Sequence, residues 1–150
     1  MFHFQLSYSP DIVNRDGKDY IFCAWRRKYV RLTPEEWVRQ HFLHALVEDF
    51  AYPQALIAVE APISVGEVNK RCDAIIYNAQ LRPLCIVEFK APTVSLTQKV
   101  FDQVAVYNRR LGVSFFFLSN GTTHYACRVL ENSYQLLPDI PIYSYLCQNT

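Results

Sequence analysis

The chain has 150 residues, which is enough for one domain that buries a sizeable hydrophobic core. Its hydrophobic content of 51% and aromatic content of 15% exclude a disordered protein. The formal net charge of +1 neither favours nor excludes a nucleic acid as partner, because only the local distribution of charge would matter.

Five cysteines are scattered along the chain, an odd number without any Cys-x-x-Cys pair. This pattern argues against a disulfide framework or a zinc site and favours a reducing cytoplasm. The amino terminus lacks the basic and apolar regions of a signal peptide, and no apolar run approaches the roughly 18 residues of a membrane span. We therefore expect a soluble cytoplasmic protein with no membrane partner.

Residues 1–32 contain short runs with β propensity, at Phe2–Leu6, Tyr20–Trp25 and Tyr29–Leu32. Asp16-Gly17 is a turn signal between them. We expect a β-rich lead-in that packs on the main sheet of the domain. The sequence of this segment does not reveal a function.

Residues 33–50 carry the first clear helix signal. Thr33 suits the N-cap, Pro34 the first helical position and Glu36 the third, which together predict a capping box. Apolar residues then recur at helical spacing. Glu36 shares a flank of this helix with Gln40 and could lean toward a neighbouring site, although the capping role explains Glu36 by itself.

His41 and His44 lie one turn apart on the same helix and could in principle share a metal. No acidic residue stands between them as a zinc protease requires, and no third ligand is evident. We therefore expect surface or partly buried histidines.

After a strand at Ala55–Ile63, the runs Arg71–Tyr77 and Leu84–Lys90 predict two strands of a hairpin. Pairing Tyr77 with Leu84 would place Ile75 opposite Ile86 and Asp73 opposite Glu88. Lys90 would share the face of Glu88, because side chains alternate along a strand. Cys85, Val87 and Phe89 would point to the other side, into the core.

Two neighbouring carboxylates repel each other, so such a pair persists when a proton or a divalent cation neutralises it. Oxygen ligands without His or Cys favour Mg²⁺, for which Mn²⁺ can substitute. Glu88 and Lys90 alone would usually be a solvated face with a weak ion pair. Here, however, they end an apolar run and precede Ala91-Pro92, so Asp73, Glu88 and Lys90 together predict a metal-assisted phosphodiesterase site.

Residues 95–111 predict a second helix, which opens with a capping box at Ser95–Gln98 and ends at Gly112. Gln103 and Tyr107 share one face of it. That face could instead pack in the core, where a buried Gln103 would need a partner.

Val113–Leu118 has the continuous apolar run of a central strand that is covered on both faces. Asn120-Gly121 predicts a turn into another strand at Thr122–Leu130. Tyr134–Leu137 and Ile142–Leu146 are weaker strand candidates.

This order of elements resembles the PD-(D/E)XK nuclease superfamily, and more closely the amino-terminal nuclease domain of type I restriction enzyme R subunits. The resemblance covers about residues 30–130. The matching stretches are Thr33–Gln40, Tyr52-Pro53, Arg71–Asp73, Ile86–Pro92, Gln103–Asn108 and Ser119–Gly121. The superfamily's proline before the aspartate is Cys72 here, at a position that varies widely.

The resemblance implies that Asp73, Glu88 and the Phe89 carbonyl hold a Mg²⁺ ion. It also implies that Lys90 serves the attacking water and that Glu36 assists from its helix. Gln103 and Tyr107 match the additional motif of this nuclease branch. Separately, the expected DNA contacts are Arg71, Lys99 and Arg109, although any basic cluster on this chain could be a solvated face.

We therefore expect one α/β domain over residues 1–150, with a restriction-endonuclease-like mixed sheet flanked by helices. Its expected activity is metal-dependent cleavage of DNA. No ATPase motif occurs, so ATP-driven cleavage by this chain alone is not expected, and a separate motor or specificity subunit is a candidate partner. The alternative is a catalytically silent module that binds DNA or a protein of a restriction or repair complex.

Overall fold

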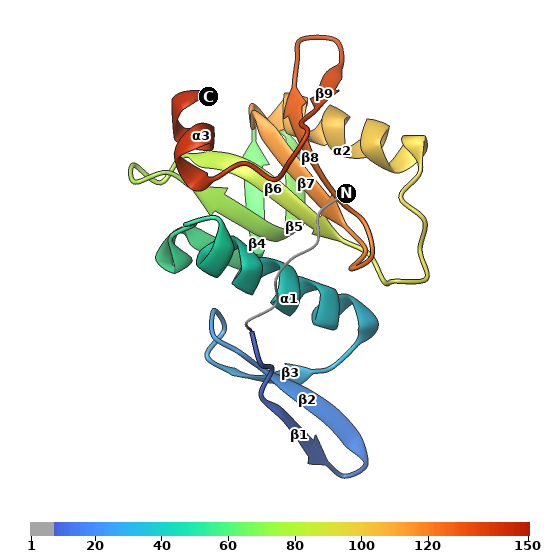
Figure 1. The fold of residues 1–150 in the computed structure, drawn as a ribbon. Coiled ribbons are helices and arrows are strands. Elements are labelled where there is room, and N and C mark those ends of the chain that lie inside the picture. Colours follow the sequence, from blue (N-terminus) through green and yellow to red (C-terminus); the bar gives the residue numbers. More distant parts are fainter. Residues whose placement is uncertain (1–7) are drawn as a thin grey trace.

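A six-stranded sheet forms the centre of the computed structural model, in which residues 8–150 are described (Figure 1). The predicted strand at Phe2–Leu6 lies outside these residues. The sheet order is β4 (Ile57–Val65), β5 (Val68–Tyr77), β6 (Pro83–Phe89), β7 (Phe115–Ser119), β8 (His124–Val129) and β9 (Tyr134–Leu136). Only β6 and β7 pair in parallel within it, so the predicted mixed sheet is confirmed.

Strand β7 is buried on both faces, as its apolar run predicted. Phe115 and Phe117 belong to the core on one face, and Phe116 belongs to the core on the other. All three side chains are fully buried, which accounts for the run of aromatic residues without polar alternation.

Helix α1 (Pro34–Asp49) covers the first of these faces, with Val38, Phe42 and Leu46 in the core. Its predicted cap is confirmed, because the backbone N–H of Glu36 donates to Thr33 Oγ1 at 3.0 Å. A short 3₁₀ turn at Gln54–Leu56 then leads into β4, later than predicted.

Helix α3 (Tyr143–Gln148) lies on the same face as α1, where a strand at Ile142–Leu146 was predicted. That prediction was wrong. Tyr143 and Leu146 are three residues apart, so one helical turn directs both into the core. The Tyr143 hydroxyl also donates to the Tyr77 carbonyl at 2.9 Å, which anchors α3 to the end of β5.

Helix α2 (Gln98–Leu111) covers the opposite face of the sheet, and Figure 1 shows the sheet between α1 and α2. It begins later than predicted, since its N-cap is Thr97 and not Ser95. The Thr97 side chain makes no capping hydrogen bond. It ends as predicted at Gly112, whose φ of +70° and backbone N–H bonds to Arg109 and Asn108 carbonyls form a left-handed C-cap.

The strands β1 (Ile12–Arg15), β2 (Lys18–Cys23) and β3 (Lys28–Arg31) form a separate antiparallel sheet. The prediction that this segment packs on the main sheet was wrong. The three strands bond only to one another, and they lie along α1 on the side away from the main sheet (Figure 1). Trp25 secures the segment after β2, since its indole donates to the Gln54 carbonyl at 3.2 Å.

All five cysteines are free thiols, and Cys147 alone among them is exposed. Within residues 8–150, no helix is long and apolar enough to cross a membrane.

Gly121 provides a test of the packing between α1 and the turn before β8. Its φ is +85°, and a Cβ added there would lie 2.9 Å from Val38 Cγ2. We expect Gly121→Ala to lower the free energy of unfolding by about 2–4 kcal/mol, through backbone strain and overpacking.

Gly66→Ala is the matched control for that substitution, because Gly66 also has a positive φ (+61°) but no neighbour within 4 Å of the added Cβ. It should cost about 1 kcal/mol from strain alone. Urea denaturation of both variants measures the difference. Equal losses would show that the Gly121 contact with Val38 does not matter.

Candidate functional site

The β5–β6 hairpin brings Asp73 and Glu88 together. The strands pair Ala74 with Val87 and Ile75 with Ile86, so the next positions along the ladder are Asp73 and Glu88. The Asp73 carboxylate reaches across to β6, where its Oδ2 accepts a 2.8 Å hydrogen bond from the backbone N–H of Phe89. The predicted adjacency of the two acids is therefore confirmed.

The register differs from the prediction at the turn of this hairpin. Tyr77 pairs with Pro83 instead of Leu84, because a bulge falls between Ile76 and Tyr77. Asn78 stabilises the turn, since its Oδ1 accepts hydrogen bonds from the backbone N–H groups of Gln80 and Arg82, both at 2.9 Å. The bulge absorbs the slip, so the pairing near Asp73 is unaffected.

Strand β5 is irregular at Asp73. Cys72 and Ile75 both join the core beneath α2, although they are three residues apart, whereas Ala74 joins the core beneath α1. Side chains alternate in a regular strand, so the alternation must break between Cys72 and Ala74. On the neighbouring strand, Glu60 is left out of the pairing between β4 and β5. Its φ of +49° is a strained backbone conformation for a residue other than glycine.

Glu88 is a buried acid with an internal cation beside it. Its side chain is 12% exposed, and its Oε1 lies 3.0 Å from Lys70 Nζ. Burial, followed by the negative charge of Asp73, raises the pKa of Glu88 to about 7, although Lys70 acts in the opposite direction. Burial alone would lower the pKa of Lys70, but the facing Glu88 carboxylate outweighs it and raises that pKa.

A pocket of about 120 Å³ opens between this end of the sheet and α2. Its lining residues are Lys70, Glu88, Lys90, Val100, Gln103, Val104 and Tyr107. The sequence prediction that Gln103 and Tyr107 share one helix face is thus confirmed, and the structure brings that face next to Glu88 and Lys90. The alternative, that this face packs in the core, is wrong, because both side chains are exposed.

Two lysines approach the pocket in different ways. Lys70 Nζ lies 5.0 Å from the centroid of the Tyr107 ring while it pairs with Glu88, so it is held on two sides. Lys90 is half-buried and forms no ion pair with a carboxylate of residues 8–150. Of these two ammonium groups, Lys90 is therefore the one available to a ligand.

Glu36 lies on the α1 side of the site and does not complete the predicted capping box with its carboxylate. Its Oε2 accepts a hydrogen bond from Gln40 Nε2 at 3.0 Å and lies 2.6 Å from Arg26 Nη2. Gln40 is fully buried, so the shared flank of Glu36 and Gln40 is confirmed. The backbone of Glu36 caps the helix while its side chain joins α1 to the segment after β2.

Arg39 stands between Glu36 and Asp73. It is 5% exposed, with Nε 3.8 Å from Glu36, Nη1 3.4 Å from Glu60 and Nη2 3.8 Å from Asp73. Burial raises the pKa of Glu60, but Arg39 and Arg26 outweigh burial and lower it. The guanidinium of Arg39 therefore lies between the carboxylates of Glu36 and Asp73 and contacts both.

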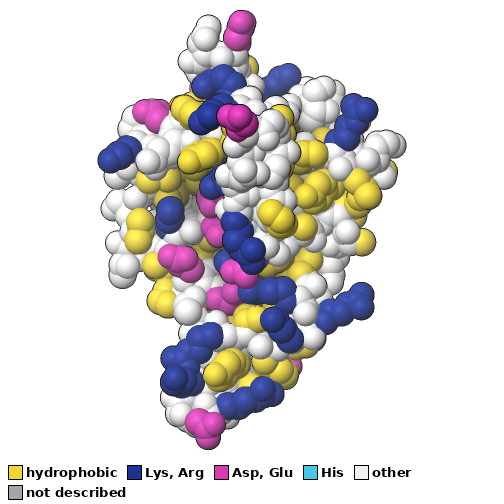
Figure 2. Space-filling view, turned by 180° about the vertical axis from the view of Figure 1, so that it is seen from behind, with side chains coloured by type: hydrophobic (Ala, Val, Ile, Leu, Met, Phe, Trp, Pro, Cys, Tyr) yellow, Lys and Arg dark blue, Asp and Glu magenta, His cyan; other side chains and the backbone are white. Residues whose placement is uncertain are grey.

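We call this set the charged network: Arg26, Glu36, Arg39, Glu60, Arg71 and Asp73. Figure 2 shows acidic and basic side chains in a column through the middle of one face of the molecule, which continues down to the three-stranded sheet. Members of the network share partners, since Glu36 and Glu60 each contact more than one guanidinium group. Removal of one charge should therefore affect the others.

The sequence analysis missed Lys70, Arg39 and Glu60 as parts of the site. Glu60 left a signal, because it interrupts an otherwise apolar strand. Arg39 gave no signal of its own, although it precedes the buried Gln40 in α1. Lys70 gave only the weak signal of a basic pair with Arg71.

The structure does not gather the three predicted DNA contacts at the site. Arg71 is exposed and lies 3.6 Å from Glu60, within the charged network. Lys99 is exposed in the first turn of α2. Arg109 donates to the carbonyls of Leu130 and Ser133 at 3.2 and 3.1 Å, so its guanidinium joins α2 to the loop before β9.

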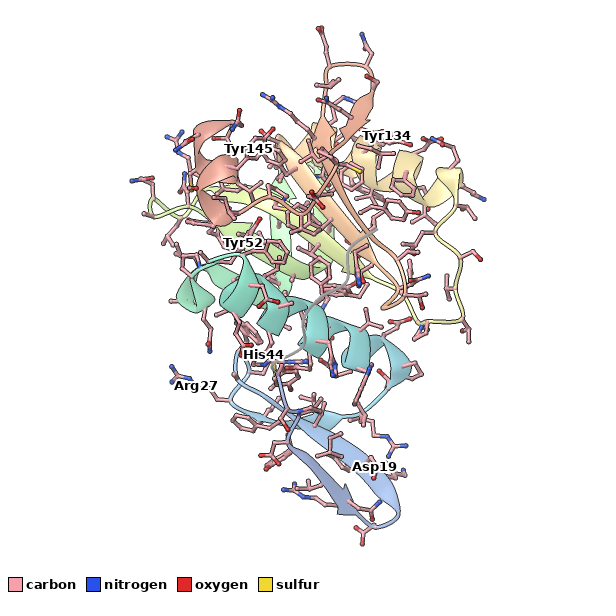
Figure 3. The ribbon with its side chains drawn as sticks, in the orientation of Figure 1. Asp19, Arg27, His44, Tyr52, Tyr134 and Tyr145 are labelled. Carbon is pink, nitrogen blue, oxygen red and sulfur yellow. The ribbon has the colours of Figure 1, made fainter. Side chains whose placement is uncertain are left out.

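His41 and His44 contact aromatic rings. His41 lies 4.0 Å from Trp37 between ring centroids, and His44 lies 5.0 Å from Trp25. His44 lies near the segment that joins β2 to β3 (Figure 3), and burial lowers its pKa. Among residues 8–150, no three His, Cys, Asp or Glu side chains lie together as a metal site.

The carboxylates of Asp73 and Glu88 nevertheless have the chemistry of a two-carboxylate Mg²⁺ site that takes its third protein ligand from the backbone. Both supply hard oxygen ligands, and the Phe89 carbonyl is the third oxygen that the sequence pattern points to. The proton affinity of buried Glu88 shows that its negative charge is not fully compensated by Lys70. A divalent cation would compensate it, so the donor set fits such an ion.

Residues 34–141 match the family described as Type I restriction enzyme R protein N terminus (HSDR_N). The chain belongs to this family. The match spans most of the chain and includes every residue of the pocket, and it places the domain among the nuclease-like domains of type I restriction R subunits. No curated protein matches the chain.

Two solved structures share the restriction-endonuclease-like fold. A fragment of a candidate HsdR subunit of a type I restriction enzyme from Vibrio vulnificus YJ016 has 18% identity and a TM-score of 0.57, over 78% of this chain and 26% of that chain. A candidate nuclease belonging to DUF820 from Anabaena variabilis ATCC 29413 has 11% identity and a TM-score of 0.51, over 91% of this chain and 88% of that chain. The domain therefore corresponds to about a quarter of the Vibrio chain.

The raised pKa of Glu88 predicts how stability depends on pH. Between the ordinary pKa of 4.5 and the folded value of about 7, the folded state binds more protons than the unfolded state. The free energy of unfolding should therefore fall as pH rises through this window, by about 1.4 kcal/mol for each unit of pKa difference. Glu88→Gln removes this loss, so its stability relative to wild type should increase from pH 5 to pH 8.

Urea denaturation without divalent cations measures this change, and Glu67→Gln is its control because Glu67 is exposed on the β4–β5 turn. The Glu67 variant should follow the wild-type profile. Parallel profiles for wild type and Glu88→Gln would show that Glu88 carries no excess proton affinity.

Glu36 should matter to stability well beyond a helix cap. The sequence alone suggested that Glu36→Gln would melt within a few degrees of wild type, because glutamine can complete a capping box. The contacts with Arg26 and Arg39 predict a larger loss, about 2–4 kcal/mol, because two guanidinium groups then lose a buried anion. Thermal unfolding measures it, and Glu35→Gln in the exposed first turn should cost less than about 1 kcal/mol.

Proposed function

We propose that this domain hydrolyses DNA phosphodiester bonds with the help of a divalent metal ion. The observation that carries the proposal is the meeting of Asp73, Glu88 and Lys90 at one end of β5 and β6, beside the exposed face of α2. Membership of the R-protein family supports DNA as the substrate.

Asp73, Glu88 and the Phe89 carbonyl would hold Mg²⁺, or Mn²⁺ in its place. The ion would supply charge stabilisation for the scissile phosphate and would lower the pKa of a bound water. The protein residues position the reactants around it. The backbone N–H of Phe89 fixes Asp73 Oδ2, and Asp73 Oδ1 lies 3.8 Å from Arg39 Nη2.

Lys90 has the role of orienting the attacking water and of stabilising charge on the phosphate. Its ammonium lines the pocket with Glu88 and has no carboxylate partner in residues 8–150. Gln103 and Tyr107 lie across the pocket on α2, where their amide and hydroxyl groups would contact the sugar-phosphate backbone of a bound strand.

Lys70 has a different role from Lys90. Its Nζ pairs with Glu88 at 3.0 Å and lies 5.0 Å from the centroid of the Tyr107 ring, so it supplies part of the positive charge that a metal would bring. Lys70 therefore stabilises the carboxylate pair, and it would be available to a phosphate oxygen if a divalent cation compensated Glu88.

A silent binding module is the second candidate, and one observation favours it. Each acid of the site has a cation from the same chain, with Lys70 beside Glu88 and Arg39 beside Asp73. A site balanced in this way folds without a metal and does not require catalysis to explain its charges. Such a module, like an active nuclease domain, would work with a motor or specificity subunit supplied separately, in the cytoplasm.

Cleavage assays test the proposed activity. We expect purified protein with Mg²⁺ or Mn²⁺ to cut plasmid, linear or branched DNA and to leave 5′-phosphate and 3′-hydroxyl ends. Lys90→Ala and Asp73→Asn should each lower the rate at least about a hundredfold, because they remove charge stabilisation and a metal ligand. Glu36→Gln, assayed below its melting temperature, should also lose most of the cleavage.

Arg82→Ala is the control for these variants, since Arg82 is exposed on the β5–β6 turn and outside the pocket. It should cleave like wild type. If wild type and Lys90→Ala behave alike on all three substrates, the domain is not a nuclease. Calorimetry is an independent test of the two candidates. Metal binding that Glu88→Ala abolishes supports the enzyme, whereas salt-sensitive DNA binding without any metal requirement supports the silent module.

A further inference from the structure

One face of the three-stranded sheet combines cations with aromatic rings. The ladder pairs Arg15 with Lys18, Tyr20 with Arg31 and Phe22 with Tyr29, and paired residues point to the same side. We call this side the outer face, and its members are Val13, Arg15, Lys18, Tyr20, Phe22, Tyr29 and Arg31. The opposite side carries Ile21 and Cys23, which are fully buried.

The three cations of the outer face are not balanced by carboxylates. Arg15, Lys18 and Arg31 are exposed, and none of them forms an ion pair with an acid of residues 8–150. This differs from the charged network, where Arg26 and Arg39 each contact acids. The protein has a net charge of only +1, so these unpaired cations are a local feature of the surface.

Aromatic rings hold the two guanidinium groups in place. Arg15 lies 5.1 Å from the centroid of Tyr29 and 6.0 Å from that of Tyr20, and Arg31 lies 5.9 Å from Tyr20 on the same sheet. A guanidinium over a ring face keeps its N–H groups at the rim, where they can donate to another molecule. Asp11 at the edge of the face is engaged separately, as acceptor of a 2.6 Å hydrogen bond from Tyr29 Oη.

The three cations come from three adjacent strands, with Arg15 on β1, Lys18 on β2 and Arg31 on β3. Neighbouring strands lie about 4.8 Å apart, so one side of the small sheet presents several positive charges to the same polyanion. Tyr20 and Tyr29 carry the guanidinium groups, whereas the Phe22 ring is 37% exposed and packs edge-on against Tyr29 at 5.4 Å. The accessible chemistry of the outer face is therefore mainly cationic hydrogen-bond donation.

Figure 2 places these features in relation to the site. Lys and Arg side chains gather with hydrophobic ones over the three-stranded sheet, and the column of charged side chains rises from there along the main body. Arg26 joins the two regions, because it follows β2 and contacts both Glu36 and Glu60. A polyanion on the outer face would therefore be held at a fixed position relative to Asp73.

We propose that the outer face of β1–β3 binds the phosphate backbone of DNA, beyond the stretch that occupies the catalytic pocket. The choice of DNA as the polyanion rests on the proposed function, whereas the cationic surface itself does not. The surface lies outside residues 34–141, which match the R-protein family. It adds binding energy and orientation to the domain without taking part in the hydrolysis.

Binding measured without divalent metal tests this inference separately from cleavage. Fluorescence anisotropy of a labelled duplex in EDTA is followed over a range of salt concentrations for wild type and for the double variant Arg15→Ala, Arg31→Ala. We expect the double variant to bind about tenfold more weakly and to reduce the slope of log K against log salt by about two, one for each lost phosphate contact. The double variant Arg15→Lys, Arg31→Lys keeps both charges and should keep most of that slope.

Arg82→Ala removes an equally exposed cation from the β5–β6 turn and should leave both affinity and slope unchanged. Circular dichroism melts establish that the double variants are folded. An unchanged slope in the alanine double variant would overturn the inference. So would an alanine double variant that loses binding to poly-glutamate, used as a second polyanion, but still binds DNA like wild type. If the alanine pair weakens DNA binding while no protein cleaves DNA, the outer face is a DNA site and the nuclease proposal alone fails.

Discussion

The stability of this fold depends on how the negative charges of two acids, Asp73 and Glu88, are compensated at the end of buried strands. Asp73 and Glu88 are neighbours across the β5–β6 pair, and each would be destabilising there without a partner. The partners come from three different elements: the Phe89 N–H from β6, Lys70 from β5 and Arg39 from α1. A residual imbalance remains at Glu88, whose pKa of about 7 shows that burial and Asp73 together outweigh Lys70. A divalent cation, as proposed, would offset that imbalance.

Each layer of the fold contributes one part of this arrangement. Helix α1 brings Glu36 and Arg39 from beneath the sheet, and α2 brings Gln103 and Tyr107 from above it. The break in alternation of β5 allows Asp73 to interact with both sides. Glu60, strained at a φ of +49°, faces the same break from β4. Regular strand pairing would avoid this strain, and strained residues in proteins occur mostly at functional sites.

The three-stranded sheet is connected to the site by charge as well as by packing. Arg26 follows β2 and contacts Glu36 at 2.6 Å and Glu60 at 3.6 Å, so the position of this small sheet is coupled to the first turn of α1. Loss of the Glu36 carboxylate would remove the contact with Arg26, and it would also leave Arg39, which contacts Asp73, without one of its acids. The same sheet presents Arg15 and Arg31 to solvent, held by aromatic rings instead of by acids.

The sequence by itself determined α1, α2, most strands of the main sheet and the acidic hairpin. Period-two patterns and turn residues were enough to pair Ile75 with Ile86, and thus to place Asp73 beside Glu88, because strand pairing is a local and nearly rigid relation. The tertiary structure alone decided which cations meet these acids, since Lys70 and Arg39 reach them through a break in alternation and a buried helix face that no linear spacing encodes. It also decided that Tyr143–Gln148 is a helix and that β1–β3 lie beyond α1, because both depend on which surface of the folded core remains to be covered.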